Sequence, residues 1–147
     1  MNDQETYSLI TLAKKTAAVY SLDSSLVCAV IEQESGWNPW ALRFEPLFER
    51  RYIHPALPSA PTTEELCLAI SWGLMQVMGQ TARESGFEGR YLNALSDPAT
   101  GLSVGCAVLS DKLDKAKGNT RKGLLLWNGG ANAEYPGQVL ARVSNYK

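Results

Sequence analysis

Signals that begin and end helices recur along almost the whole chain. Asp23 lies just before the apolar run Leu26 to Ile31 and can cap its first turn, and Pro39 stops the chain from resuming that helix. Asp97 followed by Pro98 predicts the start of a long helix, because proline fits the first helical turn. No segment alternates apolar and polar residues over the length of a strand. The sequence therefore predicts an all-α fold, or at most an α-rich α+β fold.

Shorter helical stretches surround these two. They are expected at about residues 7–20, 62–70, 81–85, 120–127 and 135–146, with Thr62 and Thr120 as N-caps. At most a short extended piece is assigned to Val77 and Met78, and no sheet is expected. Thr62 with Glu65 matches a capping box, in which side chain and backbone at a helix start satisfy each other.

The length of 147 residues is sufficient for one domain with one core, so we expect a single domain over residues 1–147, present as a monomer. The net charge of −1 gives no electrostatic reason to expect nucleic acid or an anionic membrane as a partner. The run Leu26 to Ile31 is too short to span a bilayer. The polar, acidic start Met1 to Glu5 is unlike a secretory signal, so we expect export by another route, action where the chain is made, or a signal already removed.

Neither the cysteines nor the histidine indicates a metal site. Cys28, Cys67 and Cys106 are odd in number and match no metal-binding spacing, so buried free thiols are expected, with one disulfide as the open alternative. His54 is the single histidine and has no cysteine cluster beside it in the sequence. We therefore expect no metal, no cofactor and no histidine-dependent nucleophile triad.

Glu34 stands in an unusual position for a carboxylate. Val27, Val30 and Ile31 precede it by seven, four and three residues, which places Glu34 on the apolar face of its own helix. Lost hydration should raise the pKa of its carboxyl group. A carboxylic acid that stays protonated near neutral pH is the proton donor that glycoside cleavage requires. The alternative is a helix-end glutamate that extends into solvent.

Three short stretches in a fixed order resemble one family. They are Glu34-Ser35 with Asn38 to Ala41, then Ser71 to Met78, then Leu126 to Gly130. Together they resemble the soluble lytic transglycosylases of the lysozyme-like superfamily, which include bacteriophage members, over roughly residues 20–146. The resemblance implies a lysozyme-like, mostly helical domain whose cleft binds the glycan strands of peptidoglycan, and hence an enzyme that acts at the cell wall.

The resemblance also implies a mechanism with one glutamate, Glu34. As an acid it protonates the glycosidic oxygen between N-acetylmuramic acid and N-acetylglucosamine. As a base it then takes the proton of the muramic C6 hydroxyl, which closes a 1,6-anhydro ring without water. The N-acetyl group of the substrate assists at the anomeric carbon, as in the substrate-assisted exceptions to the two-carboxylate scheme.

The second stretch supplies several candidate substrate-binding residues. Gly73 is interpreted as allowing backbone to approach a sugar, and Met75 and Gln76 as facing the cleft, while Leu74 and Val77 are expected in the core. In addition, Ser35 and Ser71 are expected either to hold the Glu34 side chain by hydrogen bonds or to be ordinary hydroxyls at the ends of elements.

The third stretch departs from the family at one position. Asn128 is carried over as an amide that orders the site, but Trp127 stands where the family has tyrosine. A tyrosine hydroxyl near Glu34 would therefore have to come from Tyr135 or Tyr52. Residues 134–138 match the closing motif of the family only loosely.

A second departure is the long gap between Glu34 and Gly73, filled by a proline-rich excursion over residues 43–61. Such long excursions are usually functional or mobile. Glu45 within it is the candidate for a second site carboxylate, or else the partner of Arg43 in an ion pair. The aromatic side chains of the excursion either stack on sugar rings or fix the segment to the core.

Two other functions remain open at this point. A goose-type muramidase is disfavoured because no aspartate lies between Glu34 and Gly73 to activate water. A non-catalytic glycan-binding or structural module is disfavoured by the presence of Glu34.

Overall fold

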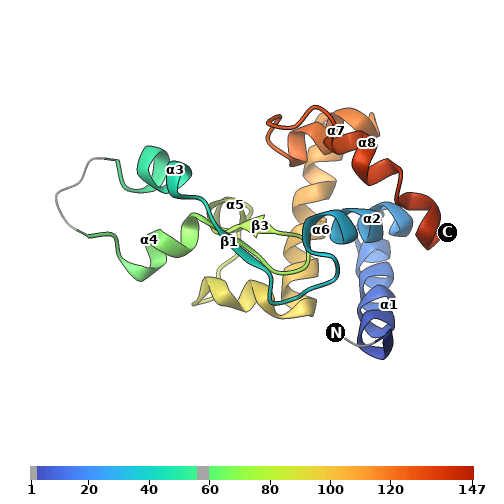
Figure 1. Ribbon diagram of the computed structural model, residues 1–147, viewed down its shortest axis with the longest axis horizontal. Helices are drawn as coiled ribbons and strands as arrows, with labels where there is room; N and C mark the ends of the chain where they lie inside the picture. Colours follow the sequence, from blue (N-terminus) through green and yellow to red (C-terminus); the bar gives the residue numbers. More distant parts are fainter. Residues whose placement is uncertain (1–2, 56–59) are drawn as a thin grey trace.

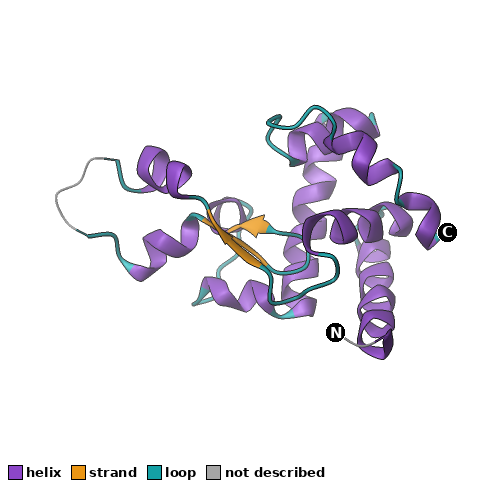
Figure 2. Cartoon of the chain, viewed as in Figure 1, coloured by secondary structure: helices purple, strands orange, loops and turns teal. Residues whose placement is uncertain are grey.

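The computed structural model describes residues 3–55 and 60–147. Helices dominate this part of the chain, as predicted, and a small sheet accompanies them (Figure 2). The helical elements are α1 (Asp3–Val19), α2 (Ser24–Ser35), α3 (Pro46–Phe48), the π-helix η1 (Glu49–Ile53), α4 (Thr63–Leu68), α5 (Gly79–Glu84), the 3₁₀ helix η2 (Leu92–Ser96), α6 (Pro98–Lys115), α7 (Thr120–Trp127), α8 (Tyr135–Leu140) and the 3₁₀ helix η3 (Val143–Tyr146).

The helical body is built around α6, which packs against α1 and α7 (Figure 1). Helix α2 packs against α1 on one side and against α8 and η3 on the other. Fully buried side chains of α2 and α6 meet in one apolar core, among them Val27, Ile31, Leu102 and Leu109. Burial of such side chains is the main stabilising contribution to a fold of this size.

Helix α2 begins and ends as the sequence predicts. The Asp23 side chain accepts hydrogen bonds from the backbone N–H groups of Ser25 and Leu26, which have no partner within the helix. Gly36 ends the helix in the left-handed conformation, with φ of 57°. This frame places Glu34 in the last turn, two residues before the chain turns away.

The remaining helix starts and ends can also be compared with those predicted from the sequence. Thr62 and Glu65 form the predicted capping box, and Asp97 caps α6 through the N–H of Thr100. The cap of α7 was predicted one residue late, because Asn119 rather than Thr120 accepts from the backbone of the first turn. The predicted last helix is divided into α8 and η3.

The expectation of no sheet is wrong. Strands β1 (Leu42–Phe44), β2 (Ile70–Trp72) and β3 (Val77–Met78) form an antiparallel sheet in the order β1-β2-β3. Leu42 pairs with Trp72, and Ser71 pairs with Met78. Strands of two or three residues are too short to show the alternation by which strands are recognised.

The proline-rich excursion is structured where it is described. After β1 the chain forms α3 and η1, here called the arm (residues 45–53), while residues 56–59 of the predicted excursion lie outside the described residues. The arm packs against α4, and the two project together from the helical body (Figure 1). Phe48 and Tyr52 pack against each other within the arm, with ring centroids 5.0 Å apart.

The three cysteines are free thiols, as predicted, with Cys28 and Cys106 buried and Cys67 half-buried. Within residues 3–55 and 60–147, no helix has the length and apolar character needed to cross a membrane. The same residues contain no group of three or more histidine, cysteine, aspartate or glutamate side chains placed to hold a metal ion.

Candidate active site

Glu34 lies in a cleft of about 680 Å³ between the arm and the helical body. The walls come from segments far apart in the sequence: the end of α2, the arm, the sheet, α5, α6 and the end of α7 with the loop that follows it. A volume of this order accommodates a ligand the size of a few sugar rings. The cleft therefore forms only when both halves of the chain have folded together.

The Glu34 carboxyl group is held by two donors on a single oxygen. The Tyr135 hydroxyl donates to Oε1 at 2.5 Å, and the Trp127 indole Nε1 donates to the same oxygen at 3.0 Å. Tyr135 is buried at the start of α8, and Trp127 is half-buried at the end of α7. Because both partners are anchored in packed helices, they fix the Glu34 side chain in one orientation.

Burial raises the pKa of Glu34 above its ordinary value of 4.5, as the sequence predicts. The hydrogen bonds from Tyr135 and Trp127, and the positive charge of Arg43, favour the ionised form and partly offset this rise. The site thus combines burial, which favours the protonated acid, with donors that favour the carboxylate.

The two donors also determine which oxygen carries the proton. With Oε1 accepting from both Tyr135 and Trp127, the proton of neutral Glu34 belongs on Oε2. None of the described residues donates a hydrogen bond to Oε2. The acidic proton is therefore available for transfer rather than committed to a neighbouring protein group.

Tyr135 supplies the hydroxyl that the tryptophan at position 127 lacks. Burial, together with the nearby Glu34 carboxylate, raises the pKa of Tyr135 far above its usual value. The phenol therefore stays neutral and acts only as a donor to Glu34. Tyr52, the other tyrosine considered, lines the cleft from the arm and makes no hydrogen bond to Glu34.

Several other predicted site residues do line the cleft. They are Glu45, Tyr52, Ser71, Gln76, Trp127 and Asn128. Glu45 is paired with Arg43 at 2.8 Å, the arrangement given as its alternative role. The Gln76 amide donates to the carbonyls of Ala41 and Gly73, and Asn128 accepts from the backbone of Asn132. These two amides therefore order the loops of the cleft wall.

Four predicted site residues do not line the cleft: Ser35, Gly73, Met75 and Tyr135, the last of which reaches Glu34 through its hydroxyl. The Ser35 hydroxyl donates to the carbonyls of Leu74 and Ile31 instead of holding Glu34. Met75 was expected to face the cleft, and this is wrong, because only 1% of it is exposed and it packs against Gly105 in the core. Leu74 and Val77 are buried, as predicted.

Gly73 has a structural role that the sequence did not reveal. Its φ is +67°, and a Cβ atom there would lie 2.5 Å from the carbonyl oxygen of Leu95. It is absent from the cleft lining, so the interpretation that it admits a sugar to the backbone is not the reason glycine stands here. Glycine is required because the chain turns tightly against η2.

Sequence reasoning also missed residues of the cleft. Arg51 and Leu47 come from the arm, and Lys112 and Val108 come from α6. Nothing local marks the α6 residues, because only the fold brings that helix opposite the arm. The sequence shows the arginines and aromatic residues of the excursion, but it does not show which of their side chains face the cleft.

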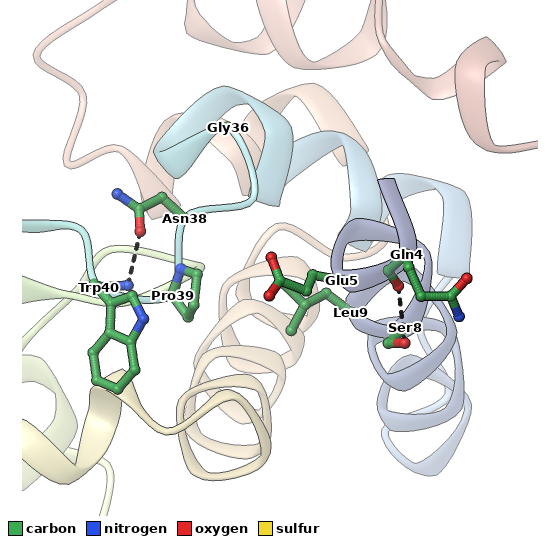
Figure 3. A pocket seen from close by; sticks show the side chains of 8 residues that line it. All are labelled: Gln4, Glu5, Ser8, Leu9, Gly36, Asn38, Pro39 and Trp40. Atoms are coloured by element: carbon green, nitrogen blue, oxygen red, sulfur yellow. Dashed lines mark hydrogen bonds between the residues drawn. The ribbon is translucent and has the colours of Figure 1, made fainter. Parts of the chain in front are cut away.

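A second hollow, of about 730 Å³, lies between the start of α1 and the loop after α2 (Figure 3). Leu9, Pro39 and Trp40 contribute its apolar lining, and Trp40 is 74% exposed. Glu34 does not line this hollow, although Trp40 follows it by only six residues. The first sequence stretch therefore contributes to two separate surfaces, and the acid belongs to the cleft alone.

Comparisons with known proteins identify the family of this chain. The family model described as the transglycosylase SLT domain matches residues 11–137. A protein named "Transglycosylase" from Enterobacteria phage PRD1 is 29% identical in an alignment of 136 residues that covers 87% of this chain. The chain spans 40% of the length of that relative. No solved structure matches the chain. Because the family model covers most of the chain, including all three sequence stretches, this protein belongs to the transglycosylase SLT domain family.

Proposed function

We propose that this protein is a peptidoglycan lytic transglycosylase that cleaves the β-1,4 bond between N-acetylmuramic acid and N-acetylglucosamine. The observation that carries the proposal is the Glu34 carboxyl group, held at Oε1 by Tyr135 and Trp127 in a cleft wide enough for sugar rings. Membership of the SLT domain family and the similarity to a phage transglycosylase support it. We further propose that residues 1–147 act as one domain, as a monomer, on the cell wall outside the cytoplasmic membrane.

In the first step Glu34 acts as general acid. Its Oε2 proton passes to the glycosidic oxygen, the bond to the anomeric carbon breaks, and the N-acetylglucosamine hydroxyl leaves. The raised pKa of Glu34 supplies the protonated form for this step. The carboxylate that results is stabilised by the Tyr135 and Trp127 donors already in place.

In the second step the same carboxylate acts as general base. Oε2 takes the proton from the C6 hydroxyl of the muramic sugar. The C6 oxygen then forms the new bond to the anomeric carbon of the same sugar. The products are a 1,6-anhydromuramic end and a free N-acetylglucosamine end, and Glu34 is protonated again. No water is consumed.

Glu45 is the residue on which a hydrolytic alternative would depend. It lies in the same cleft and is held by Arg43, so it could activate water as the second carboxylate of a goose-type muramidase. The ion pair gives Glu45 a structural role that needs no catalysis. We therefore place the lyase reaction first.

The products of digestion distinguish the two reactions. Purified peptidoglycan is digested with the protein, and the soluble fragments are analysed by mass spectrometry without prior reduction. We expect 1,6-anhydro ends, each lighter by one water than the hydrolysed counterpart. Reducing muramic ends would instead support the muramidase, and the absence of soluble fragments would leave only a non-catalytic glycan-binding role.

Tyr135→Phe tests the coupling between the phenol and the acid. Removing the hydroxyl removes a bond that favours ionised Glu34, so the pKa of Glu34 should rise further. Activity that needs protonated Glu34 is lost as pH rises through this pKa, so the high-pH limb of the rate profile should move to higher pH. The maximal rate should fall about tenfold, because the carboxylate formed in the first step loses a donor.

Tyr52→Phe is the matched control, since Tyr52 lines the same cleft without a bond to Glu34. It should leave the high-pH limb in place. If the high-pH limb of the Tyr135→Phe rate profile stayed in place or moved to lower pH, the assigned role of Tyr135 would be contradicted.

A further inference from the structure

The cleft contains more positive charge than its chemistry at Glu34 requires. Arg43, Arg51 and Lys112 all line it. Arg43 is neutralised by Glu45 at 2.8 Å. Neither Arg51 nor Lys112 forms an ion pair with any described residue, in contrast to Lys115, one turn away from Lys112, which is paired with Asp111. Two of the three positive side chains that line the cleft therefore have no ion-pair partner among the described residues.

These two cations reach the cleft from opposite structural units. Arg51 belongs to η1 in the arm, and Lys112 belongs to the last turn of α6 in the helical body. Arg51 is exposed and Lys112 is half-buried, so both charges stay in contact with solvent. Both side chains also line the surface on which a bound glycan would lie.

The Arg51 guanidinium lies against an aromatic side chain of the arm. It is 5.3 Å from the centroid of the Tyr52 ring, and that ring packs against Phe48. Stacking on an aromatic ring leaves the N–H donors at the edge of the guanidinium free for a planar, two-oxygen acceptor. A carboxylate has this shape, whereas a sugar hydroxyl does not.

The substrate class offers carboxylates at regular positions. N-acetylglucosamine is neutral, whereas each muramic residue carries a lactyl group on C3. That lactyl group ends either in its own carboxylate or in a stem peptide, which bears carboxylates of its own. Positive charges in the cleft wall thus match the substituent of the muramic ring rather than the sugar backbone.

We propose that Arg51 and Lys112 form a carboxylate-binding subsite that recognises the acidic substituent of muramic residues, so that the cleft selects peptidoglycan strands over neutral glycans of the same backbone. This inference rests on the proposed function, because it concerns the same cleft. It assigns the arm a role in substrate selection, which the sequence alone left undetermined.

Binding is measured by titration calorimetry in a Glu34→Gln background, so that no ligand is cleaved. Three tetrasaccharides serve as probes: one from peptidoglycan with its stem peptides, the same glycan with the peptides removed, and chitotetraose, which has no carboxylate. The variants are Arg51→Gln, Lys112→Gln and the double substitution. Arg50→Gln is the matched control, because Arg50 is the adjacent residue of η1, donates to the Pro46 carbonyl and does not line the cleft.

We expect the double variant to bind the acidic glycans on the order of tenfold more weakly at low salt, with a smaller loss in each single variant. Chitotetraose binding should not change. Added salt should weaken the binding of acidic glycans to the protein with Arg51 and Lys112 intact, and it should have little effect on their binding to the double variant. Arg50→Gln should behave like its parent, and all variants should retain the thermal midpoint of the parent.

The two acidic probes distinguish the sources of the carboxylate. A loss on the peptide-free glycan alone places the lactyl carboxylate in the subsite, and a loss on the peptide-bearing glycan alone places a stem-peptide carboxylate there. A loss on both glycans means that the subsite accepts either carboxylate. The proposal of a subsite would be overturned if the double variant bound acidic glycans as tightly as the parent, or if it lost as much affinity for chitotetraose. The same loss of affinity in Arg50→Gln would also overturn it. Formation of anhydro ends by the protein with Glu34 intact is measured separately, so the failure of the subsite and that of the proposed function are told apart.

Discussion

We expect Glu34→Gln to leave the protein folded and to lower peptidoglycan cleavage by about 10²–10⁴-fold, the usual range for loss of a general acid or base. The amide has the shape of the acid, and its carbonyl oxygen can accept the same hydrogen bonds from Tyr135 and Trp127. It cannot give up a proton to the glycosidic oxygen or take one from the C6 hydroxyl. The rate of release of soluble fragments from peptidoglycan measures the effect.

The same substitution has a predicted effect on stability. The folded-state pKa of Glu34 is raised above 4.5, so folding disfavours the ionised form, and the protein loses stability as pH rises from 4.5 through the folded-state pKa. Glu34→Gln removes this titration. At neutral pH the variant should therefore have the higher thermal midpoint, and the difference should shrink below pH 4.5, where Glu34 is protonated in both states.

Glu32→Gln is the matched control on the same helix. Glu32 accepts from the Tyr146 hydroxyl at 2.7 Å and does not line the cleft. Its amide should leave the cleavage rate within a few-fold of the parent. If Glu34→Gln retained most of the activity, or if Glu32→Gln lost as much, Glu34 would not be the proton-transfer residue.

Gly73→Ala is expected to destabilise the fold by about 3 kcal/mol or more. The left-handed φ of +67° costs an alanine roughly 1–2 kcal/mol, and the new Cβ would meet the Leu95 carbonyl oxygen at 2.5 Å. Backbone lies on both sides of this contact, so relief requires β2 or η2 to move. The thermal midpoint should fall by roughly 6–12 °C.

Gly118→Ala is the control that separates the cost of the positive φ from the cost of the steric contact with Leu95. Gly118 has a similar φ of +76° and no atom within 4 Å of an added Cβ, so it reports the conformational cost alone. Gly73→Ala should lose clearly more stability than this control. Equal losses would mean that the close approach to Leu95 is absent. A stable Gly73→Ala protein without activity would restore the interpretation that Gly73 admits the substrate.

Caps and helix ends could be read from the sequence because their chemistry is local. Asp23, Thr62 and Asp97 each satisfy N–H groups within a few residues of themselves. Glu34 was also accessible from the sequence, since the apolar face of one helix determined its surroundings. These predictions needed no knowledge of the rest of the fold.

The side-chain directions in residues 73–76 could not be predicted in this way. Gly73 and Gln76 both have positive φ, so the chain turns twice and ordinary alternation does not apply. Met75 is directed into the core because Gly105 leaves room for it, with an added Cβ there lying 2.4 Å from the Met75 sulfur. Gly101 likewise leaves room for the Leu95 carbonyl oxygen, which an added Cβ would meet at 2.4 Å. Such contacts depend on tertiary packing between distant segments.

The hydroxyl of Tyr135 was foreseen only as one of two possibilities, for the same reason. Tyr135 is 101 residues from Glu34, and only the packing of α8 on α2 brings them together. Tyr52 lies closer in the sequence but belongs to the arm. Sequence distance is therefore a poor guide to which group holds a catalytic acid.

The placement of Tyr135 and Trp127 has a consequence for how the protein gains its activity during synthesis. A growing chain contains Glu34 early, but the two donors that orient it arrive only when α7 and α8 have left the ribosome and α8 has packed against α2 and α7. Until then the carboxyl group has neither its fixed orientation nor its buried surroundings. The proposed catalytic centre is thus complete only once these helices are in place, and a chain that lacks α7 and α8 would contain Glu34 without the two donors that orient it.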